Sequence, residues 1–338
     1  MDYLIFSLSI LLVYVGLAIL LHVQFGLAGI PNFGVVGFWG FGMYAVGVLQ
    51  VQFELSFIDA MAILAVLMVA LSYVLGRLLL RCDSQAILCG TLAFSVIVAF
   101  LVVSEKWLTE GVVGLGTIRY PVRIGGWTET LYFVFLLSLV GLLQYAVLKL
   151  HVSHYARLLI SIRDNEELSA SLGKDTFRIK LGVFVITGTL MGIIGGLSAP
   201  LNQFLTPNMI VPGITFAVWI SLALGGREHA LGATIGVFFT FGLFDILIET
   251  YLPVAPELAV MVPNAKLFIY GTVLVAVLMY RPRGILPKHF MPPQPLVDKI
   301  EDRAARTWTR GRATAISAAG LAKAKAADVQ KQIRGRRR

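Results

Sequence analysis

The chain has 338 residues, of which 57% are hydrophobic and only 14% are charged, and its mean hydropathy is +0.82. Soluble domains typically carry about 25% charged residues, so the composition excludes a water-soluble globular protein. The formal net charge of +9 comes from the end of the chain, because the segment 281–338 is strongly basic and the residues before it are close to neutral. This balance indicates a basic tail and gives no reason to expect a nucleic-acid partner.

Long apolar stretches predict an all-α polytopic membrane protein with about nine transmembrane helices, within a range of roughly eight to ten. A helix needs ~20 apolar residues to cross the hydrocarbon core. The expected spans are roughly 3–22, 33–50, 58–80, 86–104, 130–150, 179–201, 214–226, 229–249 and 265–281. The first of them is interpreted as a retained helix and not as a cleaved signal.

Glycine and length set some of these spans apart. The span 33–50 contains five glycines, and 214–226 is short for a bilayer. Irregular backbone is tolerated at membrane depth only where protein or a water-filled cavity covers it, so we expect both segments inside the helix bundle. Three further glycines, Gly188, Gly192 and Gly196, recur every four residues and predict close packing against a neighbouring helix.

The distribution of Lys and Arg orients the spans, since cytoplasmic loops carry an excess of both. With the basic tail in the cytoplasm, counting the spans backwards places the N-terminus outside and the C-terminus inside. The loop 151–178 then lies in the cytoplasm. The predicted organisation is a transmembrane domain over 1–287 and a basic cytoplasmic tail over 288–338, partly helical or disordered and drawn to anionic membrane lipids.

The cytoplasmic loop contains the segment SIRDNEELSASLG (161–173), which is expected to form a helix of about two turns. Asp164, followed three residues later by Glu167, resembles a capping box at the helix start. Gly173 suits the left-handed position that ends a helix. The segment is therefore expected to be a short helix with its own start and stop signals.

Leu168 and Leu172 are four residues apart and share one face of this expected helix. A helix this short is marginal alone, so its apolar face should be buried against something. Two interpretations stay open at this point. The face packs on the ends of the chain's own spans, or it docks another protein.

Polar side chains inside apolar spans are candidates for a transport pathway, since placing them in hydrocarbon costs free energy. Ordinary packing against protein or lipid is the competing interpretation for the aromatic candidates. Asp245 and Glu249 fit either solvation at the membrane surface or a role in the pathway or in docking a binding protein. The polar candidates are Asn32, Thr91, Ser95, Asn202, Gln203 and Ser221, and the candidate aromatic walls are Phe38, Trp39, Phe94 and Trp219.

Neither catalytic nor metal-binding residues are expected. The five histidines follow no metal-binding spacing, the two cysteines suggest no metal motif, and no G-x-S-x-G nucleophile motif is present in the sequence. The sequence also has no G-x-x-x-x-G-K-S/T loop, which cradles nucleotide phosphates. If ATP drives transport, a separate subunit must bind it.

Six motifs, in order along the chain, resemble permease subunits of branched-chain amino acid ABC transporters, the LivM-like branch. Together they cover roughly residues 20–287. The sequence departs from the family pattern at Glu110, at 227–229 and at 82–84, which leaves the substrate open. The motifs are GLAGIPNFGVVGFWGFGMYAVGVL (26–49), SQAILCGTLAFSVIV (84–98), TEGVVGL (109–115), ARLLISIRDNEELSASLGKDTFRIKLGVFVITGTLMGIIGGLSAPL (156–201), ALGGREHALGATIG (223–236) and YRPRGIL (280–286).

The resemblance implies the permease subunit of an ATP-binding-cassette importer in a bacterial or archaeal cell (inner) membrane. The implied partners are a second permease subunit forming a heterodimer, two cytosolic ABC ATPase subunits that use ATP and Mg²⁺, and an extracytoplasmic solute-binding protein. The chain itself would be no enzyme and would bind no cofactor.

The implied cargo is branched-chain or related amino acids. A urea or short-amide permease of the same family is the alternative. Two other classes are a stand-alone secondary transporter, which would need paired broken helices in two repeats, and a scaffold without transport activity.

By the same resemblance, the segment 161–173 would be the coupling helix that docks into the ATPase. Its implied contact residues are Arg163, Asp164, Asn165 and Glu166, with Leu168 and Leu172 seating the helix and Gly173 ending it.

Overall fold

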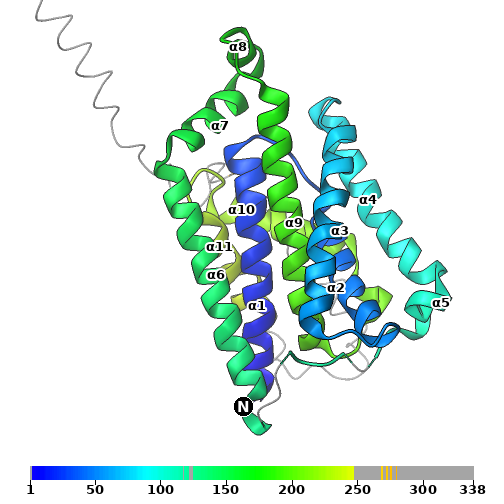
Figure 1. The fold of residues 1–338 in the computed structure, drawn as a ribbon. Coiled ribbons are helices and arrows are strands. Elements are labelled where there is room, and N and C mark those ends of the chain that lie inside the picture. Colours follow the sequence, from blue (N-terminus) through cyan, green and yellow to red (C-terminus); the bar gives the residue numbers. More distant parts are fainter. Residues whose placement is uncertain are drawn as a thin grey trace, which may run out of the picture. The chain divides into compact units, whose positions relative to one another are not determined.

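A computed structural model describes residues 2–246, apart from 117 and 122–124, together with the isolated positions 268, 272, 275 and 279. These residues belong to one compact unit, Met1–His289. Within the described part, every regular element is a helix, and one isolated antiparallel bridge joins Leu115 and Leu205 (Figure 1). The expectation of an all-α polytopic membrane protein is confirmed at this level.

The elements follow in chain order. The first are α1 (Asp2–Leu21), the π-helical turn η1 (His22–Leu27), α2 (Val35–Val51), α3 (Phe57–Leu79), α4 (Ser84–Ser104), α5 (Lys106–Thr109), the 3₁₀ turns η2 (Gly111–Val113) and η3 (Gly125–Trp127), and α6 (Thr128–Val152). The others are α7 (His154–Asp164), α8 (Glu166–Ser171), α9 (Thr176–Asn202), η4 (Pro207–Met209), α10 (Pro212–Gly225), α11 (Gly232–Val237) and the π-helical η5 (Phe238–Ile246).

Six helical segments in the described part are long and apolar enough to cross a membrane. The expected span 33–50 forms the shorter apolar helix α2, and 229–249 begins as another short one, Gly232–Gly242. Apart from the four isolated positions, the expected span 265–281 and the tail 288–338 lie outside the described residues, so the count of nine stays a prediction. The six segments are Leu4–Leu27, Phe57–Leu79, Ser84–Ser104, Thr128–Val152, Thr176–Asn202 and Pro207–Gly225.

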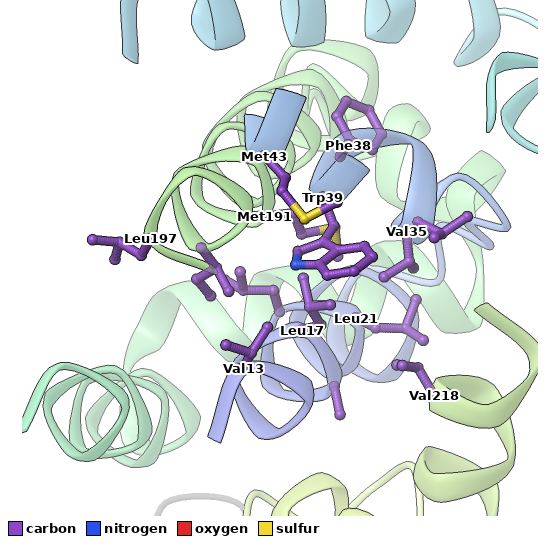
Figure 2. Close-up of a cluster of buried hydrophobic side chains, with 14 of the residues drawn as sticks. Val13, Leu17, Leu21, Val35, Phe38, Trp39, Met43, Met191, Leu197 and Val218 are labelled. Carbon is purple, nitrogen blue, oxygen red and sulfur yellow. The ribbon is translucent and has the colours of Figure 1, made fainter. Parts of the chain in front are cut away.

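The buried core includes α2, which is covered along most of its length. Figure 2 shows Trp39 of α2 among Leu17 of α1, Met43 of α2 and Met191 of α9. The expectation that the glycine-rich segment lies inside the bundle is therefore confirmed. The span that contains α10, the other segment expected inside, is half buried.

Glycines let α9 approach two helices closely. A Cβ atom on Gly195 would lie 2.0 Å from the Trp39 carbonyl oxygen, and one on Gly42 would lie 1.9 Å from the Gly192 carbonyl oxygen. The backbones of α2 and α9 therefore meet where no larger residue fits. The predicted glycine face of α9 packs against α3, with Gly188 facing Ser72, Gly192 facing Met68 and Gly196 facing Leu64.

The two ends of the helix bundle carry different elements. α7 and α8 lie together at one end, whereas α5 and the start of α1 lie at the other (Figure 1). The segment expected as a loop over 151–178 is mostly helical, because α6 continues to Val152 and α7 follows after one residue. α7 is an addition to the predicted elements, although its buried residues Ala156, Leu159 and Ile162 recur at helical spacing.

Candidate functional site

The helical path of the chain is interrupted between η1 and α2. Residues 28–34, which we call the break, form no helix, yet Ala28, Ile30 and Asn32 are at most 1% exposed. Unpaired backbone groups are costly in such a place, since no water can bind them. The side chains that satisfy this backbone are therefore constrained by the fold.

Asn32 organises the break through its side chain. Its Nδ2 donates to Oε1 of Gln24 (2.8 Å), and its Oδ1 accepts from the amide of Gly34 (2.6 Å). The side-chain amide of Gln24 donates in turn to Oγ1 of Thr187 on α9 (2.6 Å). Gln24 and Asn32 are fully buried, so removing either side chain would leave polar groups without partners.

Hydroxyl groups from two other helices accept hydrogen bonds from the backbone amides around the start of α2. The first amide groups of a helix have no partner within that helix, and here side chains of α4 and α10 accept from amides at or next to the helix start. The break is thereby tied to both of these helices. The pairs are Thr91 with the amide of Phe33 (2.9 Å), Ser95 with that of Gly37 (3.2 Å) and Thr215 with that of Val36 (3.1 Å).

Aromatic rings pack beside the same segment. Nε1 of Trp219 donates to the carbonyl oxygen of Asn32 (2.8 Å), and its ring meets that of Phe33 with the centroids 5.0 Å apart. Phe38 and Phe94 contact each other with centroids 4.9 Å apart. The aromatic side chains therefore pack α2 against α10 and α4.

Six of the ten predicted pathway residues come together around the break and the first turn of α2. Trp39 lies instead in the core (Figure 2), and Ser221 pairs with Thr240 of η5. Because the protein itself takes up the hydrogen bonds of the polar residues in this group, a pathway role for them stays a prediction. The six are Asn32, Phe38, Thr91, Phe94, Ser95 and Trp219.

The remaining polar candidates lie elsewhere. Asn202 is the last residue of α9, and Gln203 follows it with a left-handed backbone (φ 54°). The side chain of Gln203 hydrogen-bonds to Tyr120, whose hydroxyl has a pKa raised by burial. Asp245 falls within η5, but its side chain and the whole of Glu249 lie outside the described residues.

Three residues of the site were not among the predicted candidates: Gln24, Thr187 and Thr215. Gln24 has a usable signal, because it is an isolated amide in a long apolar run. The two threonines have none, since a threonine hydroxyl in a helix commonly bonds the preceding turn. Their roles depend on contacts with distant parts of the chain.

A separate apolar cavity of about 430 Å³ lies between α2, α3, α4 and α5. Its walls include Phe41, Val48 and Leu101, with Glu105 among the lining residues. Tyr44 also lines it, and the Tyr44 hydroxyl has no partner among the described residues. The lining includes none of the predicted pathway residues, so the cavity and the break are distinct features.

The second candidate site is the segment 161–173, where the sequence predicts a short helix. This helix, α8, begins one residue later than expected. Asp164 is the last residue of α7, and Asn165 is extended (φ −154°, ψ 99°), with its Oδ1 accepting from the amide of Leu168 (2.9 Å). The predicted capping box of Asp164 and Glu167 is therefore wrong. Because α7 runs through Asp164, Asn165 is the first residue that can adopt the extended backbone of a cap. Gly173 has φ +80°, which confirms the predicted helix stop.

The apolar face of α8 is uncovered within the described part of the chain. Leu168 is 57% exposed and Leu172 is 72% exposed. The interpretation in which this face packs on the chain's own spans is therefore wrong for the described residues. α8 is held elsewhere, through an ion pair between Glu166 and Lys180 of α9 and through the buried Ser169.

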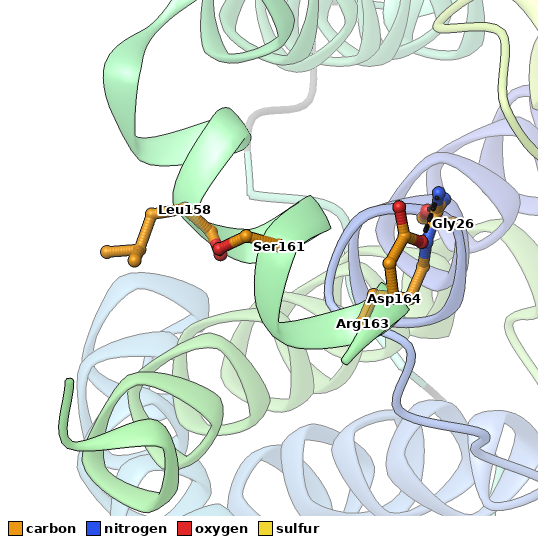
Figure 3. A network of polar contacts seen from close by, with 5 residues as sticks. All are labelled: Gly26, Leu158, Ser161, Arg163 and Asp164. Carbon is orange, nitrogen blue, oxygen red and sulfur yellow. Dashed lines mark hydrogen bonds and ion pairs between the residues drawn. The ribbon is translucent and has the colours of Figure 1, made fainter. Parts of the chain in front are cut away.

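Arg163 lies between α8 and the break. Its side chain is only 16% exposed and points into the bundle, where Nη1 donates to the carbonyl oxygen of Gly26 (Figure 3). Its Nε and Nη2 each lie 2.9 Å from Oδ1 of Asp164. The last turn of η1, which leads into the break, is therefore in direct contact with the segment that leads into α8.

These features define a class of protein: a multi-pass helical membrane protein with a buried, interrupted helix and a short capped helix at one end. The family described as the permease component of branched-chain amino acid transport systems matches residues 3–278. The chain belongs to this family and is a membrane permease subunit. The resemblance carried by the six sequence motifs is thereby confirmed.

Several relatives support the assignment. LivM, the high-affinity branched-chain amino acid transport system permease protein of Escherichia coli K12, is 26% identical over 304 residues, which cover 82% of this chain and 69% of LivM. A probable LivM of Methanocaldococcus jannaschii is 23% identical over 340 residues, covering 87% and 97% of the two chains. A probable LivH permease of the same archaeon is 28% identical over 161 residues, covering 45% and 46%.

Proposed function

We propose that this chain is the membrane subunit of an ATP-driven importer that takes up branched-chain or related amino acids. The observation that carries the proposal is the family match over residues 3–278. Since the sequence has no phosphate-binding loop, two separate ATPase subunits would hydrolyse ATP with Mg²⁺. A solute-binding protein outside the cell membrane would deliver the cargo.

The second permease subunit would be a different chain. Relatives named LivM and LivH occur in the same organism, Methanocaldococcus jannaschii, and both are similar to this chain. Two related but distinct permeases of one organism support a heterodimer. In the assembled transporter, the end of the bundle with α7 and α8 would face the cytoplasm, and the N-terminus would face outside.

α8 would be the coupling helix that docks an ATPase subunit. Three features support this role: its own cap at Asn165, its stop at Gly173, and the uncovered apolar pair Leu168 and Leu172. Exposed apolar side chains on a short helix are stabilised when a partner covers them. A helix bounded at both ends also moves as a unit, whereas a loose loop would absorb the displacement.

The polar residues beside this pair would have different roles. The Asp164 side chain is 62% exposed and can meet a partner. Asn165 uses its side chain for the cap, and Glu166 is already paired with Lys180. We therefore propose Asp164, Leu168 and Leu172 as the direct contacts, with Asn165 and Glu166 holding α8 in place.

Uptake by the complete transporter tests the proposal. The double variant Leu168→Asp, Leu172→Asp places two charges on the proposed interface, and Leu168→Met, Leu172→Met is the matched apolar control. Both are reconstituted in proteoliposomes with the second permease, the ATPase subunits and the binding protein. We expect the Asp variant to lose ATPase binding and leucine uptake by roughly a hundredfold, because charges in an apolar interface remain desolvated and unpaired.

The Met control should stay within about twofold of the unchanged protein, since methionine keeps the apolar contact. Uptake that survives the Asp variant would contradict the docking role of α8. Transport of urea or acetamide in place of leucine by the unchanged protein would contradict the proposed cargo while leaving the docking role intact.

A further inference from the structure

We propose that Arg163 passes the movement of α8 into the break between η1 and α2. The inference rests on the function proposed above, in which α8 docks an ATPase, and adds an internal route from the docking site to the membrane helices. Arg163 is then a positioning residue, and its guanidinium serves the chain's own backbone and not the ATPase surface.

The first contact of this route is at the end of η1. The carbonyl groups in the last turn of a helix lack helical partners and carry partial negative charge, so a guanidinium is a suitable donor for the carbonyl oxygen of Gly26. A Cβ atom on Gly26 would lie 2.4 Å from the carbonyl oxygen of Arg227. The end of η1 is therefore held between Arg163 and the turn that follows α10.

The second contact is at Gly29, inside the break. A Cβ atom on Gly29 would lie 2.6 Å from Cγ of Arg163 and 3.3 Å from its Cα, and Gly29 has φ +69°. Both the side chain and the backbone of Arg163 thus touch the break directly. Close-packed groups of this kind transmit a displacement, because protein interiors have low compressibility.

The link from Arg163 to α8 is short. Asn165 is the one residue between α7 and α8. Its amide donates to the carbonyl oxygen of Ser161 (3.0 Å), and its side chain accepts from the amide of Leu168. The carboxylate of Asp164 pairs with Nε and Nη2 of the guanidinium, and Nη1 donates to the carbonyl oxygen of Gly26. A shift of α8 is therefore passed to Arg163 through a segment hydrogen-bonded on both sides.

The break distributes such a shift to three helices. Asn32 connects it to α9 through Gln24 and Thr187. Thr91 connects it to α4, and Trp219 connects it to α10. Arg163 contacts the chain at Gly26 and Gly29, and the hydrogen bonds of the break lead from there to residues that the sequence suggests for the transport pathway.

The experiment compares Arg163→Ala and Arg163→Lys with the control Arg178→Ala in the complete transporter. Arg178 lies at the start of α9, near α8 in sequence, is 84% exposed, and has its own carboxylate partner in Asp175. Three quantities are measured in proteoliposomes: the amount of ATPase bound, the rate of leucine uptake, and the leucine imported per ATP hydrolysed.

We expect Arg163→Ala to keep its bound ATPase but to import roughly tenfold less leucine per ATP, the size expected for the loss of a charged hydrogen bond. Arg163→Lys should recover part of this loss, since an ammonium group can still donate to the carbonyl oxygen of Gly26. Arg178→Ala should import as much leucine per ATP as the unchanged protein.

Two outcomes would overturn the inference. Loss of bound ATPase in Arg163→Ala would make Arg163 a docking contact, and an unchanged ratio of leucine to ATP would show that it transmits nothing. If Arg163→Ala fails to enter the membrane, the test uses Arg163→Lys in its place. Less leucine imported per ATP than by Arg178→Ala supports the inference, and an equal amount overturns it. Failure of the proposed function itself is seen separately, as full uptake by the Leu168→Asp, Leu172→Asp variant.

Discussion

The break and α8 differ in how far the chain itself covers their side chains and satisfies their hydrogen bonds. The break is buried, and the side chains of Asn32, Thr91 and Trp219 satisfy its backbone from within the chain. α8 satisfies its own start with Asn165 but leaves Leu168 and Leu172 exposed. The polar groups of the first region are therefore satisfied within the chain, whereas the second leaves two apolar side chains uncovered by the described residues, which the proposed ATPase contact would cover. Changes in the break should thus act on stability, and changes on the face of α8 should act on assembly.

The largest stability effect is expected where α2 and α9 touch. Gly195→Ala would place a Cβ 2.0 Å from the carbonyl oxygen of Trp39. The two helices must move apart to make room for this Cβ, which should lower the free energy of unfolding by about 3 kcal/mol. Gly182→Ala is the control on the same helix, because its Cβ would meet no atom within 4 Å, and alanine should raise stability by about 0.5–1 kcal/mol. Denaturant unfolding in detergent measures both. Equal effects of the two variants would contradict the close contact.

A smaller effect is expected in the break itself. Asn32→Ala removes the partners of the Gly34 amide and of Gln24 Oε1. Two buried polar groups left unpaired, at about 1 kcal/mol each, should lower the free energy of unfolding by about 2 kcal/mol. In the control Ser138→Ala, the residue is exposed and its hydroxyl bonds the carbonyl oxygen of Val134 in its own helix, so the change should stay within about 0.5 kcal/mol. Similar losses for both variants would mean that the break is not held by Asn32.

The smallest effect is expected at the start of α8. Asn165→Ala should destabilise this helix by about 1 kcal/mol through loss of the cap, which hydrogen exchange at the Leu168 amide measures as faster exchange. Asp164→Ala should leave this exchange nearly unchanged, because Asp164 does not accept from that amide. Faster exchange in Asp164→Ala than in Asn165→Ala would restore the capping box predicted from the sequence.

Sequence patterns singled out several residues of the break, as candidates for the pathway, but not the contacts that satisfy its backbone. Asn32, Thr91 and Ser95 stand out because they are polar within apolar spans. Thr187 and Thr215 do not, since their partners lie more than 150 residues away along the chain. Their roles follow from packing of helices that no local pattern describes.

In α8, the stop at Gly173 was predictable because glycine readily adopts a left-handed backbone. The start was misplaced by one residue. Asp and Asn are about equally good caps, and the choice between Asp164 and Asn165 depends on where α7 ends. The inward direction of Arg163 was likewise not predictable, since it depends on the position of Gly26 in space.

The most direct test of a partner at α8 is cross-linking from its exposed face. Cys82 and Cys89 are both exposed and are first replaced by serine. A cysteine at Leu172 is then compared with one at Val113, which is 75% exposed and ends η2. The turn η2 packs against α5, and α5 lies at the opposite end of the bundle from α8 (Figure 1). After treatment of the assembled transporter with a short bifunctional reagent, Leu172→Cys should capture the ATPase subunit and Val113→Cys should not. Capture of the ATPase from Val113, or its absence from Leu172 in a transporter that still imports leucine, would contradict the docking role of α8.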